Sequence, residues 1–200
     1  MDKMQNDIPC IKFIEVPDLA TAKTYTNGFI FHYGNSCASM LGKTPGYTPA
    51  GSGYYQPSWP EQWQGITLSK NCAMSEKVVQ HEVLHGMGVQ HEHERSDRDE
   101  YITYNEAYAY DPKQYEKMPA NRHNKSPIAG DLEIESVMTY DSYNGKGAWD
   151  MVLKKTGQPF SGGSRMTTSD ALQMQWWYCN DLLGNPDYKY KVRENQLFYE

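Results

Sequence analysis

Residues 81–91 of this 200-residue chain read HEVLHGMGVQH and hold three histidines, one glutamate and two glycines. On a helix, His81 and His85 lie four residues apart and project from one face, so two imidazole nitrogens can reach one metal ion. His91 could not join them if the helix ran on, because it would lie too far along the axis. Gly88 resolves this, since glycine reaches positive φ without steric cost and lets the chain turn back.

This arrangement predicts a catalytic zinc site with one bound ion. Three neutral imidazoles leave one coordination position open, whereas structural zinc is usually closed off by four protein ligands rich in cysteine. Glu82 lies beside the first ligand and is predicted to act as the general base toward zinc-bound water. The alternative is that the histidines are solvated or core side chains. Gly88, His91 and a second signal at Met138 argue against that alternative.

The residues after the third histidine resemble one family. Residues 91–102 read HEHERSDRDEYI. With the preceding stretch they match the pattern HExxHxxGxxHExxRxDRD of the astacin metallopeptidases, a branch of the metzincins, at every fixed position from His81 to Asp99. Val89 replaces the family's usual phenylalanine. The other histidines lie outside the pattern, and we expect His93 to be a surface neighbour.

Residues 136–140, SVMTY, resemble the Met-turn of the same family, SxMxY, with Thr139 where histidine is common. The resemblance implies that Met138 forms an apolar floor beneath the zinc ligands. It also implies that Tyr140 is a switchable fifth ligand whose hydroxyl can stabilise the developing oxyanion. Glu92 is, in this family, linked through water to the N-terminal ammonium of the mature enzyme. Taken alone, Met138 and Tyr140 would be read as core and as a partly buried aromatic residue.

The resemblance implies an α+β, metzincin-like fold for a catalytic domain over residues 1–180. Its upper subdomain, residues 1–91, is expected to hold a twisted, mostly parallel sheet with an antiparallel edge strand, and the active-site helix. The lower subdomain, residues 92–180, is expected to be irregular, with the Met-turn and a C-terminal helix. Residues 181–200 read as a tail or linker.

The first half of the chain contains short strand patterns and one predicted helix start. Residues 11–16 and 29–33 are apolar or aromatic runs that predict strands. Residues 65–69 alternate and resemble the family's edge strand, along which a peptide substrate would pair as an added strand. Ser75 is a predicted N-cap for the active-site helix.

A stretch rich in glycine, proline and aromatic residues lies between the predicted strands, over residues 42–64. Its aromatic side chains could line the substrate cleft, or they could pack on one another in a surface flap. The sequence does not decide between these alternatives. The residues concerned are Tyr54, Tyr55, Trp59 and Trp63.

Four cysteines allow three pairings. The family resemblance selects two of the possible bonds, Cys10 with Cys179 and Cys37 with Cys72. Disulfides persist in oxidising compartments, which favours an extracellular protein.

Composition excludes several classes of function. The formal net charge of −6 disfavours a nucleic-acid partner, whose phosphates need a basic surface. No apolar run reaches the roughly 18 residues of a membrane span.

No signal peptide is visible. The opening residues MDKMQND resemble the last turns of a family helix, so we expect a leader, a removed propeptide and the first part of the mature enzyme to precede them.

These features predict a secreted zinc endopeptidase that acts on proteins or peptides. Two alternatives remain at this stage: a zinc-bound but inactive protein-binding module, and a metzincin peptidase of another branch. Lys154 aligns near the family's pocket for the residue after the cut and would there favour an acidic residue. It is also compatible with a solvated surface lysine.

Overall fold

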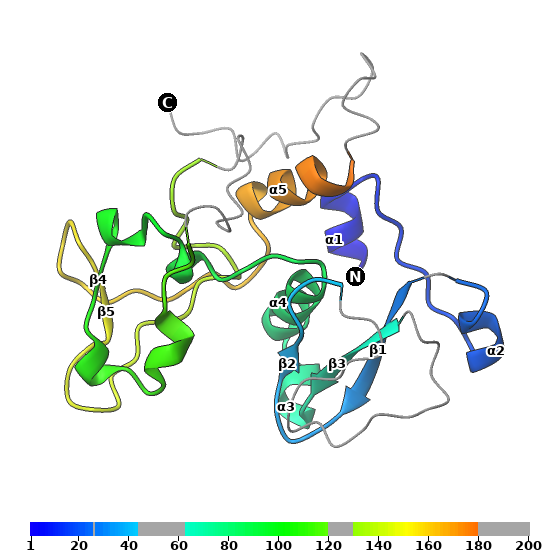
Figure 1. Ribbon diagram of the computed structural model, residues 1–200, viewed down its shortest axis with the longest axis horizontal. Coiled ribbons are helices and arrows are strands. Elements are labelled where there is room, and N and C mark those ends of the chain that lie inside the picture. The colour runs from blue at the N-terminus through cyan, green and yellow to red at the C-terminus, as the bar shows by residue number, and fades with distance from the viewer. Residues whose placement is uncertain (26, 44–62, 120–129, 180–200) are drawn as a thin grey trace, which may run out of the picture. The chain divides into compact units, whose positions relative to one another are not determined.

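The computed structural model describes residues 1–25, 27–43, 63–119 and 130–179. The chain forms two compact units, each described separately below (Figure 1). The first, Phe13–Gln90, is here called the sheet unit. The second, Met1–Lys12 together with His91–Glu200, is called the Met-turn unit. Residues 1–12, expected in the upper subdomain, thus belong with the second half of the chain.

The sheet unit contains a three-stranded sheet in the order β1-β3-β2. Strand β1 (Gly28–Tyr33) runs parallel to β3 (Trp63–Leu68), with a register that places Gly28 opposite Trp63. Strand β2 (Ala38–Ser39) runs antiparallel to β3 on its other side. The mostly parallel sheet with one antiparallel edge strand agrees with the sequence expectation.

The position of the edge strand differs from the expectation. Residues 65–69 were expected at the edge, but residues 63–68 form the central strand β3, and β2 is the antiparallel edge. All six residues of β3 are buried, including the polar Gln64 and Thr67. Alternation of polar and apolar residues suggested a half-exposed strand, whereas the polar side chains of this strand are buried inside the unit.

Residues 11–16 were expected to form a strand and do not. No strand among the described residues pairs with this segment, and the Ile14 side chain is 53% exposed. An apolar run becomes a strand only where a neighbouring strand accepts its backbone hydrogen bonds. The pattern alone could not supply that neighbour.

One aromatic residue of the glycine- and proline-rich stretch is described, and it is a core residue. Trp63 is 7% exposed, its ring fills the space beside Gly28, and its Nε1 donates to the carbonyl of Tyr25 at 3.3 Å. Trp63 is therefore not part of a substrate-facing wall. Tyr54, Tyr55 and Trp59 lie outside the described residues, as does the tail over residues 181–200.

Helix α4 (Glu76–Gly86) follows the sheet after the short helix α3 (Lys70–Ala73), and it packs against β2 and β3 (Figure 1). The predicted N-cap is confirmed, since the Ser75 hydroxyl accepts from the backbone N–H of Val78 at 3.4 Å. Glu76 in the first turn is favourably placed relative to the helix dipole. A further short helix, α2 (Leu19–Ala22), precedes β1.

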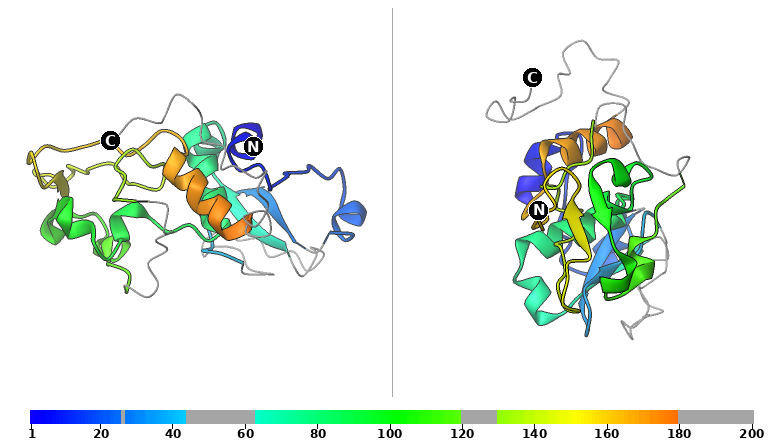
Figure 2. Two further views of the ribbon diagram at one scale, coloured as in Figure 1. Left: turned by 90° about the horizontal axis from the view of Figure 1, so that it is seen from above. Right: turned by 90° about the vertical axis from the view of Figure 1, so that its left-hand side faces the viewer.

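The Met-turn unit joins the two ends of the described chain. Helix α1 (Asp2–Asp7) lies against the C-terminal helix α5 (Thr168–Tyr178), as two further views show (Figure 2). The Gln175 Nε2 donates to the Asp7 carbonyl at 2.9 Å. Cys10 and Cys179 close the contact with a disulfide bond. The second bond joins Cys37 to Cys72 in the sheet unit, so both pairs are those that the family resemblance implied.

The remaining elements of the Met-turn unit are short. Strands β4 (Ile102–Tyr104) and β5 (Met151–Leu153) form an antiparallel pair beside a small core. That core consists of Ile102, Ala109, Tyr115, Leu132 and Met151. The 3₁₀ helices are η1 (Glu92–Glu94), η2 (Arg98–Glu100), η3 (Glu106–Tyr108) and η4 (Pro112–Tyr115). Among the described residues, no helix is long and apolar enough to cross a membrane.

We expect the two disulfides to contribute unequally to stability. They join cysteines 169 and 35 positions apart, and closing the longer loop removes more entropy from the unfolded chain. The double variant Cys10→Ser with Cys179→Ser should lose about 5 kcal/mol of unfolding free energy, and Cys37→Ser with Cys72→Ser about 4 kcal/mol, by the chain-entropy relation. Denaturant unfolding measures both. A larger loss from the Cys37–Cys72 pair would contradict the expected order.

Candidate active site

Helix α4 brings two predicted metal ligands together on one face. The imidazole rings of His81 and His85 have centroids 4.5 Å apart and meet edge to face, with an interplanar angle of 86°. Both residues are half-buried. The Nδ1 atom of His85 lies 2.7 Å from the carbonyl oxygen of Val89. A carbonyl can only accept, so Nδ1 carries the proton and Nε2 keeps the lone pair that a metal requires.

Helix α4 ends at the position that Gly88 predicted. Gly88 has a φ of 101°, its N–H donates to the His85 carbonyl at 2.8 Å, and the Val89 N–H donates to the Leu84 carbonyl at 2.9 Å. These two bonds form a Schellman motif, which satisfies carbonyls that the last turn leaves open. A second glycine, Gly42, approaches the same turn and donates its N–H to the His85 carbonyl at 2.8 Å. The sequence therefore predicted the stop, but not the second glycine that packs on it.

Glu82 directly follows His81 in the sequence. Its side chain is buried, with 6% of the residue surface exposed. Burial raises the pKa of the Glu82 carboxyl to about 7, and a backbone hydrogen bond with Ser39 of β2 acts in the opposite direction. A carboxyl with a pKa near neutrality can exchange a proton in both directions, which suits a general base that later acts as an acid.

His91 begins the Met-turn unit and is the N-cap residue of η1. It is 8% exposed, and two aromatic rings of its own unit hold it in place. The ring of His93 stacks on it with centroids 4.8 Å apart and planes 24° apart, and the ring of Tyr140 lies 4.4 Å away. The Glu94 carboxylate lies 3.1 Å from its Nδ1.

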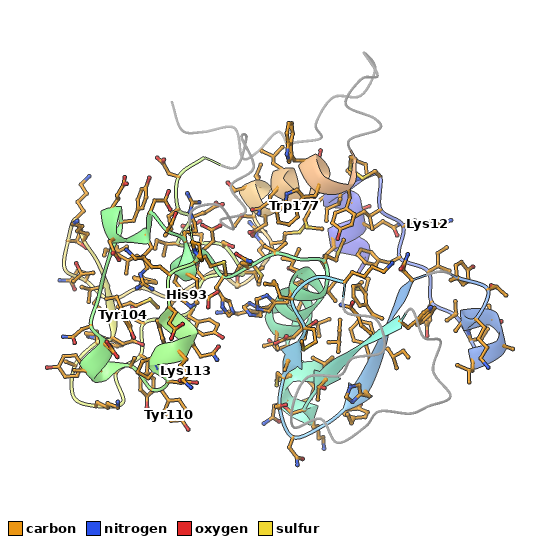
Figure 3. The ribbon with its side chains drawn as sticks, viewed as in Figure 1. Lys12, His93, Tyr104, Tyr110, Lys113 and Trp177 are labelled. Carbon is orange, nitrogen blue, oxygen red and sulfur yellow. A yellow bond between two sulfur atoms is a disulfide. The ribbon has the colours of Figure 1, made fainter. Side chains whose placement is uncertain are left out.

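His93 is a buried residue, and the expectation that it lies at the surface is wrong (Figure 3). It is 0% exposed, and its Nε2 lies 3.1 Å from the Gln114 carbonyl. Its Nδ1 accepts the backbone N–H of Tyr140 at 3.3 Å. A carbonyl partner on one nitrogen and an N–H partner on the other fix a neutral ring with the proton on Nε2. His93 therefore positions Tyr140.

The sequence carried no signal for this role. The alternation HEHE in residues 91–94 places His93 in a short segment where a 3₁₀ turn, rather than an α-helix, decides which side chains face inward. That choice depends on the packing of the segment against the Met-turn. Single-sequence periodicity does not reveal it.

Met138 lies in a tightly hydrogen-bonded turn. It is 0% exposed, its N–H donates to the Ser136 hydroxyl oxygen at 2.9 Å, and its carbonyl accepts from the Glu92 N–H at 3.1 Å. The Ser136 hydroxyl in turn donates to the buried Asp170 carboxylate at 2.7 Å. This turn is therefore tied to η1 on one side and to the start of α5 on the other.

Asp170 forms the link to α5. Its carboxylate accepts from the Thr167 N–H at 2.8 Å, and Thr167 completes a capping box at the start of the helix. Burial raises the pKa of Asp170 to about 6, although the hydrogen bonds from Thr167 and Ser136 oppose that rise. The buried carboxylate is retained because the Ser136 hydroxyl and the Thr167 N–H donate to its oxygens.

Glu92 is paired with Arg95, which also binds Asp97. The Arg95 Nη1 donates to the Glu92 carboxylate at 3.1 Å, and the Arg95 guanidinium also holds Asp97 through two bonds of 2.9 Å. The Glu133 N–H donates to the same Glu92 oxygen at 3.3 Å. Burial raises the pKa of Glu92 to about 7, with the Asp170 charge adding to the rise and Arg95 opposing it.

Lys154 is exposed and has a partner in its own unit. Its Nζ donates to the carbonyl oxygen of Asp99 at 2.7 Å, and its backbone N–H donates to the carbonyl of Tyr101 at 2.8 Å. These bonds tie the residue that follows β5 to η2 and to Tyr101 at its end. They supply a structural role for the lysine that is independent of any substrate.

Comparison with known proteins gives consistent matches. A family model described as Astacin, a peptidase family, matches residues 1–179. Astacin-like metalloprotease toxin 4 of Loxosceles laeta is 31% identical over 122 residues, which cover 59% of this chain and 90% of the toxin. Astacin-like metalloprotease toxin 5 of Loxosceles gaucho is 30% identical over 139 residues, covering 68% of this chain and 62% of the toxin.

Other relatives are longer, and one solved structure shares the fold. Zinc metalloproteinase nas-27 of Caenorhabditis elegans is 39% identical over 70 residues, which cover 35% of this chain and 13% of that protein. The chain thus spans less than two thirds of the length of several relatives. High choriolytic enzyme 1, a hatching enzyme zinc-protease of Oryzias latipes, superimposes with a TM-score of 0.65 at 18% identity, covering 89% of this chain and 82% of the other. This likeness confirms the α+β, metzincin-like fold.

We expect Gly88→Ala to impair both folding and metal binding. An alanine at a φ of 101° is strained, which costs about 1–3 kcal/mol, and it would shift the end of α4 that carries the first two histidines. Gly157→Ala is the matched control, because Gly157 also has positive φ and lies in the other unit with open space around it.

Both variants should lose stability in thermal unfolding, but Gly88→Ala alone should bind zinc more weakly. Competition with a chromophoric chelator measures the zinc affinity. Equal zinc affinities for the two variants would show that the turn at Gly88 does not position the ligands.

Proposed function

Because the chain belongs to the astacin family of peptidases, we propose that it is a secreted zinc-dependent endopeptidase that hydrolyses peptide bonds in proteins. The observation that carries the proposal is the end of helix α4. There, two edge-to-face histidines, a buried glutamate with a pKa near 7 and a glycine-terminated helix occur together. A helix that is solvated, or that has only a structural role, does not require this combination.

The proposed metal ligands are His81, His85 and His91, which together would hold one Zn²⁺. The donor set fits the ion, since zinc favours neutral imidazoles and catalytic sites use three protein ligands. His85 already presents Nε2, because its Nδ1 is engaged by Val89. His91 follows the turn at Gly88 by three residues, which is the spacing that the ligand pattern requires. When bound, zinc lowers the pKa of its water and polarises the substrate carbonyl.

The proton transfers fall to Glu82. Its carboxylate takes the proton from the attacking water, and the resulting carboxylic acid protonates the leaving amine. The raised pKa favours the second transfer, because a carboxyl that holds its proton near neutral pH can carry it from one step to the next. No serine or cysteine nucleophile takes part, so an acyl-enzyme should not accumulate.

Tyr140 is proposed to stabilise the negative charge that develops on the carbonyl oxygen. Its backbone is fixed by the hydrogen bond to His93, and its ring lies 4.3 Å from that of His93 and 4.4 Å from that of His91. These contacts place Tyr140 next to the proposed ligand His91, and its hydroxyl is proposed to be a switchable fifth ligand as well as an oxyanion stabiliser. Met138, fully buried in the neighbouring turn, forms the proposed apolar floor.

We place the substrate along β2, the antiparallel edge of the sheet. The backbone of Ser39 in β2 hydrogen-bonds to Glu82, so a peptide added to this edge would run close to the proposed base. A specificity role for Lys154 remains a weaker proposal, because its Nζ already donates to Asp99. Peptide-library profiling of Lys154→Glu would decide it, and an unaltered preference would leave only the surface role.

Secretion and the loss of a propeptide belong to the same proposal. Two disulfides favour an oxidising compartment. Of the two alternatives from the sequence, a different metzincin branch is excluded by the family match. An inactive binding module could keep its zinc ligands without a base, so the retained and buried Glu82 argues against it.

Replacement of the base should separate catalysis from metal binding. We expect Glu82→Gln to keep one zinc per chain and to lose about 10²–10⁴-fold in cleavage of casein or of a fluorogenic peptide library. The control is Glu76→Gln, an exposed glutamate in the first turn of the same helix, which should cleave normally. Chelation should abolish the activity of both wild type and control.

The outcomes distinguish the competing functions. Cleavage that persists in Glu82→Gln would remove the glutamate from the mechanism. A wild-type chain that binds a full equivalent of zinc and cleaves nothing would favour the binding module.

The pH dependence follows from the same carboxyl. The base form of Glu82 is lost as the pH falls through its pKa of about 7. A bound dication would lower this pKa, because it favours the charged carboxylate. We therefore expect kcat/KM to fall on the acid side with a midpoint at or below pH 7, while the zinc content is held constant by excess metal. A rate that stays constant through this range until the metal is lost would contradict the assignment.

A further inference from the structure

We propose that Glu94 is a positioning residue for the metal ligand His91. Its carboxylate accepts the Nδ1–H of His91 and so holds the ring in the tautomer that offers Nε2 to the metal. The inference rests on the proposed function, since it assumes that His91 binds zinc. The fixed positions of the family pattern do not include Glu94, which occupies one of its variable positions.

The geometry follows from the local helix. His91 caps the 3₁₀ helix η1, and Glu94 is the last residue of that helix. A 3₁₀ helix has three residues per turn, so side chains three positions apart lie directly above one another. The Glu94 Oε2 and the His91 Nδ1 are 3.1 Å apart, and their side chains are only 16% and 9% exposed. Water therefore competes little for the bond.

Both partners are held in place by their backbones and by packing. The Glu94 N–H donates to the His91 carbonyl at 3.3 Å, and the Glu94 carbonyl accepts from the Met118 N–H at 2.8 Å. The His91 ring lies against His93 on one side and Tyr140 on another. With the ring held between two others, the carboxylate fixes what packing cannot, namely which nitrogen carries the proton.

The two metal ligands described here use different acceptors for their second nitrogen. His85 gives its Nδ1–H to the neutral carbonyl of Val89, whereas His91 faces a carboxylate. A carboxylate behind a ligating imidazole orients the ring and adds negative charge near a dication, and loss of such a partner typically weakens metal binding about 10–100-fold. Glu94 should therefore contribute to zinc affinity without touching the metal.

A direct metal-ligand role for Glu94 is the competing explanation. Ligand atoms of His91, His93 and Glu94 lie within 4.8 Å of one another, close enough for a separate cation. However, His93 accepts from the Tyr140 N–H through Nδ1 and faces the Gln114 carbonyl through Nε2. It would have to break one of these bonds in order to ligate. The observed contacts therefore favour Glu94 as the hydrogen-bond partner of a single ligand.

The first test measures zinc affinity by chelator competition in four proteins. We expect Glu94→Ala to bind zinc about 10–100-fold more weakly than wild type, and Glu94→Gln, which keeps an acceptor oxygen but loses the charge, to lie between them. Glu106→Ala, which removes an exposed glutamate from the same unit, is the matched control and should bind as wild type does. Every variant should bind at most one zinc.

The second test does not depend on the metal. In metal-free protein with ¹⁵N-labelled histidine, at a pH where imidazoles are neutral, the wild-type His91 ring should show the proton on Nδ1. Glu94→Ala should show a mixture of tautomers. Circular dichroism and thermal unfolding check that each variant folds, and Glu94→Gln preserves the test if the alanine variant does not.

The outcomes separate this inference from the proposed function. A wild-type chain that binds no zinc would defeat the proposed function, and the claim about zinc affinity with it, even if the tautomer result stood. Normal zinc binding in wild type together with unchanged affinity and tautomer in Glu94→Ala would overturn the positioning role alone. Loss of a second equivalent of zinc in Glu94→Ala would show that Glu94 is a ligand and would overturn it as well.

Discussion

Helix α4 has to stop directly after its second histidine, and the remaining features of the site depend on that stop. The carbonyls of its last turn are satisfied by the Gly88 and Val89 N–H groups in a Schellman motif, and Gly42 donates a further bond to the His85 carbonyl. The same turn brings the Val89 carbonyl to Nδ1 of His85. Helix termination and the choice of histidine tautomer are thus consequences of one backbone conformation.

In the Met-turn unit, buried polar groups fix the arrangement of the Met-turn in addition to the packing of buried apolar side chains. Ser136, Asp170 and Thr167 connect the Met-turn to α5, while Arg95 joins Glu92 to Asp97. Each of these groups would be costly to bury alone, and each is satisfied by a neighbour. Such networks define one geometry more sharply than apolar contacts do, because a half-satisfied arrangement is strongly disfavoured.

Features set by local chemistry could be predicted from the sequence, and features set by distant packing could not. The Ser75 cap, the stop at Gly88 and the spacing of His81 and His85 are local, and the structure contains all three. The central position of β3 depends on which strands flank it. The burial of His93 depends in the same way on the chain around residues 114 and 140. The pairing of the cysteines came from family resemblance, because four cysteines alone leave three possibilities.

The central claim is that three histidines hold a single zinc ion and leave one coordination position open. X-ray absorption spectroscopy of the zinc-loaded chain tests this claim most directly. We predict three imidazole nitrogens and one or two further oxygen ligands, water with or without the Tyr140 oxygen, at about 2.0–2.2 Å in wild type. In His91→Ala the number of imidazoles should fall to two. Two imidazoles in wild type, or a zinc environment that does not change in His91→Ala, would contradict the account.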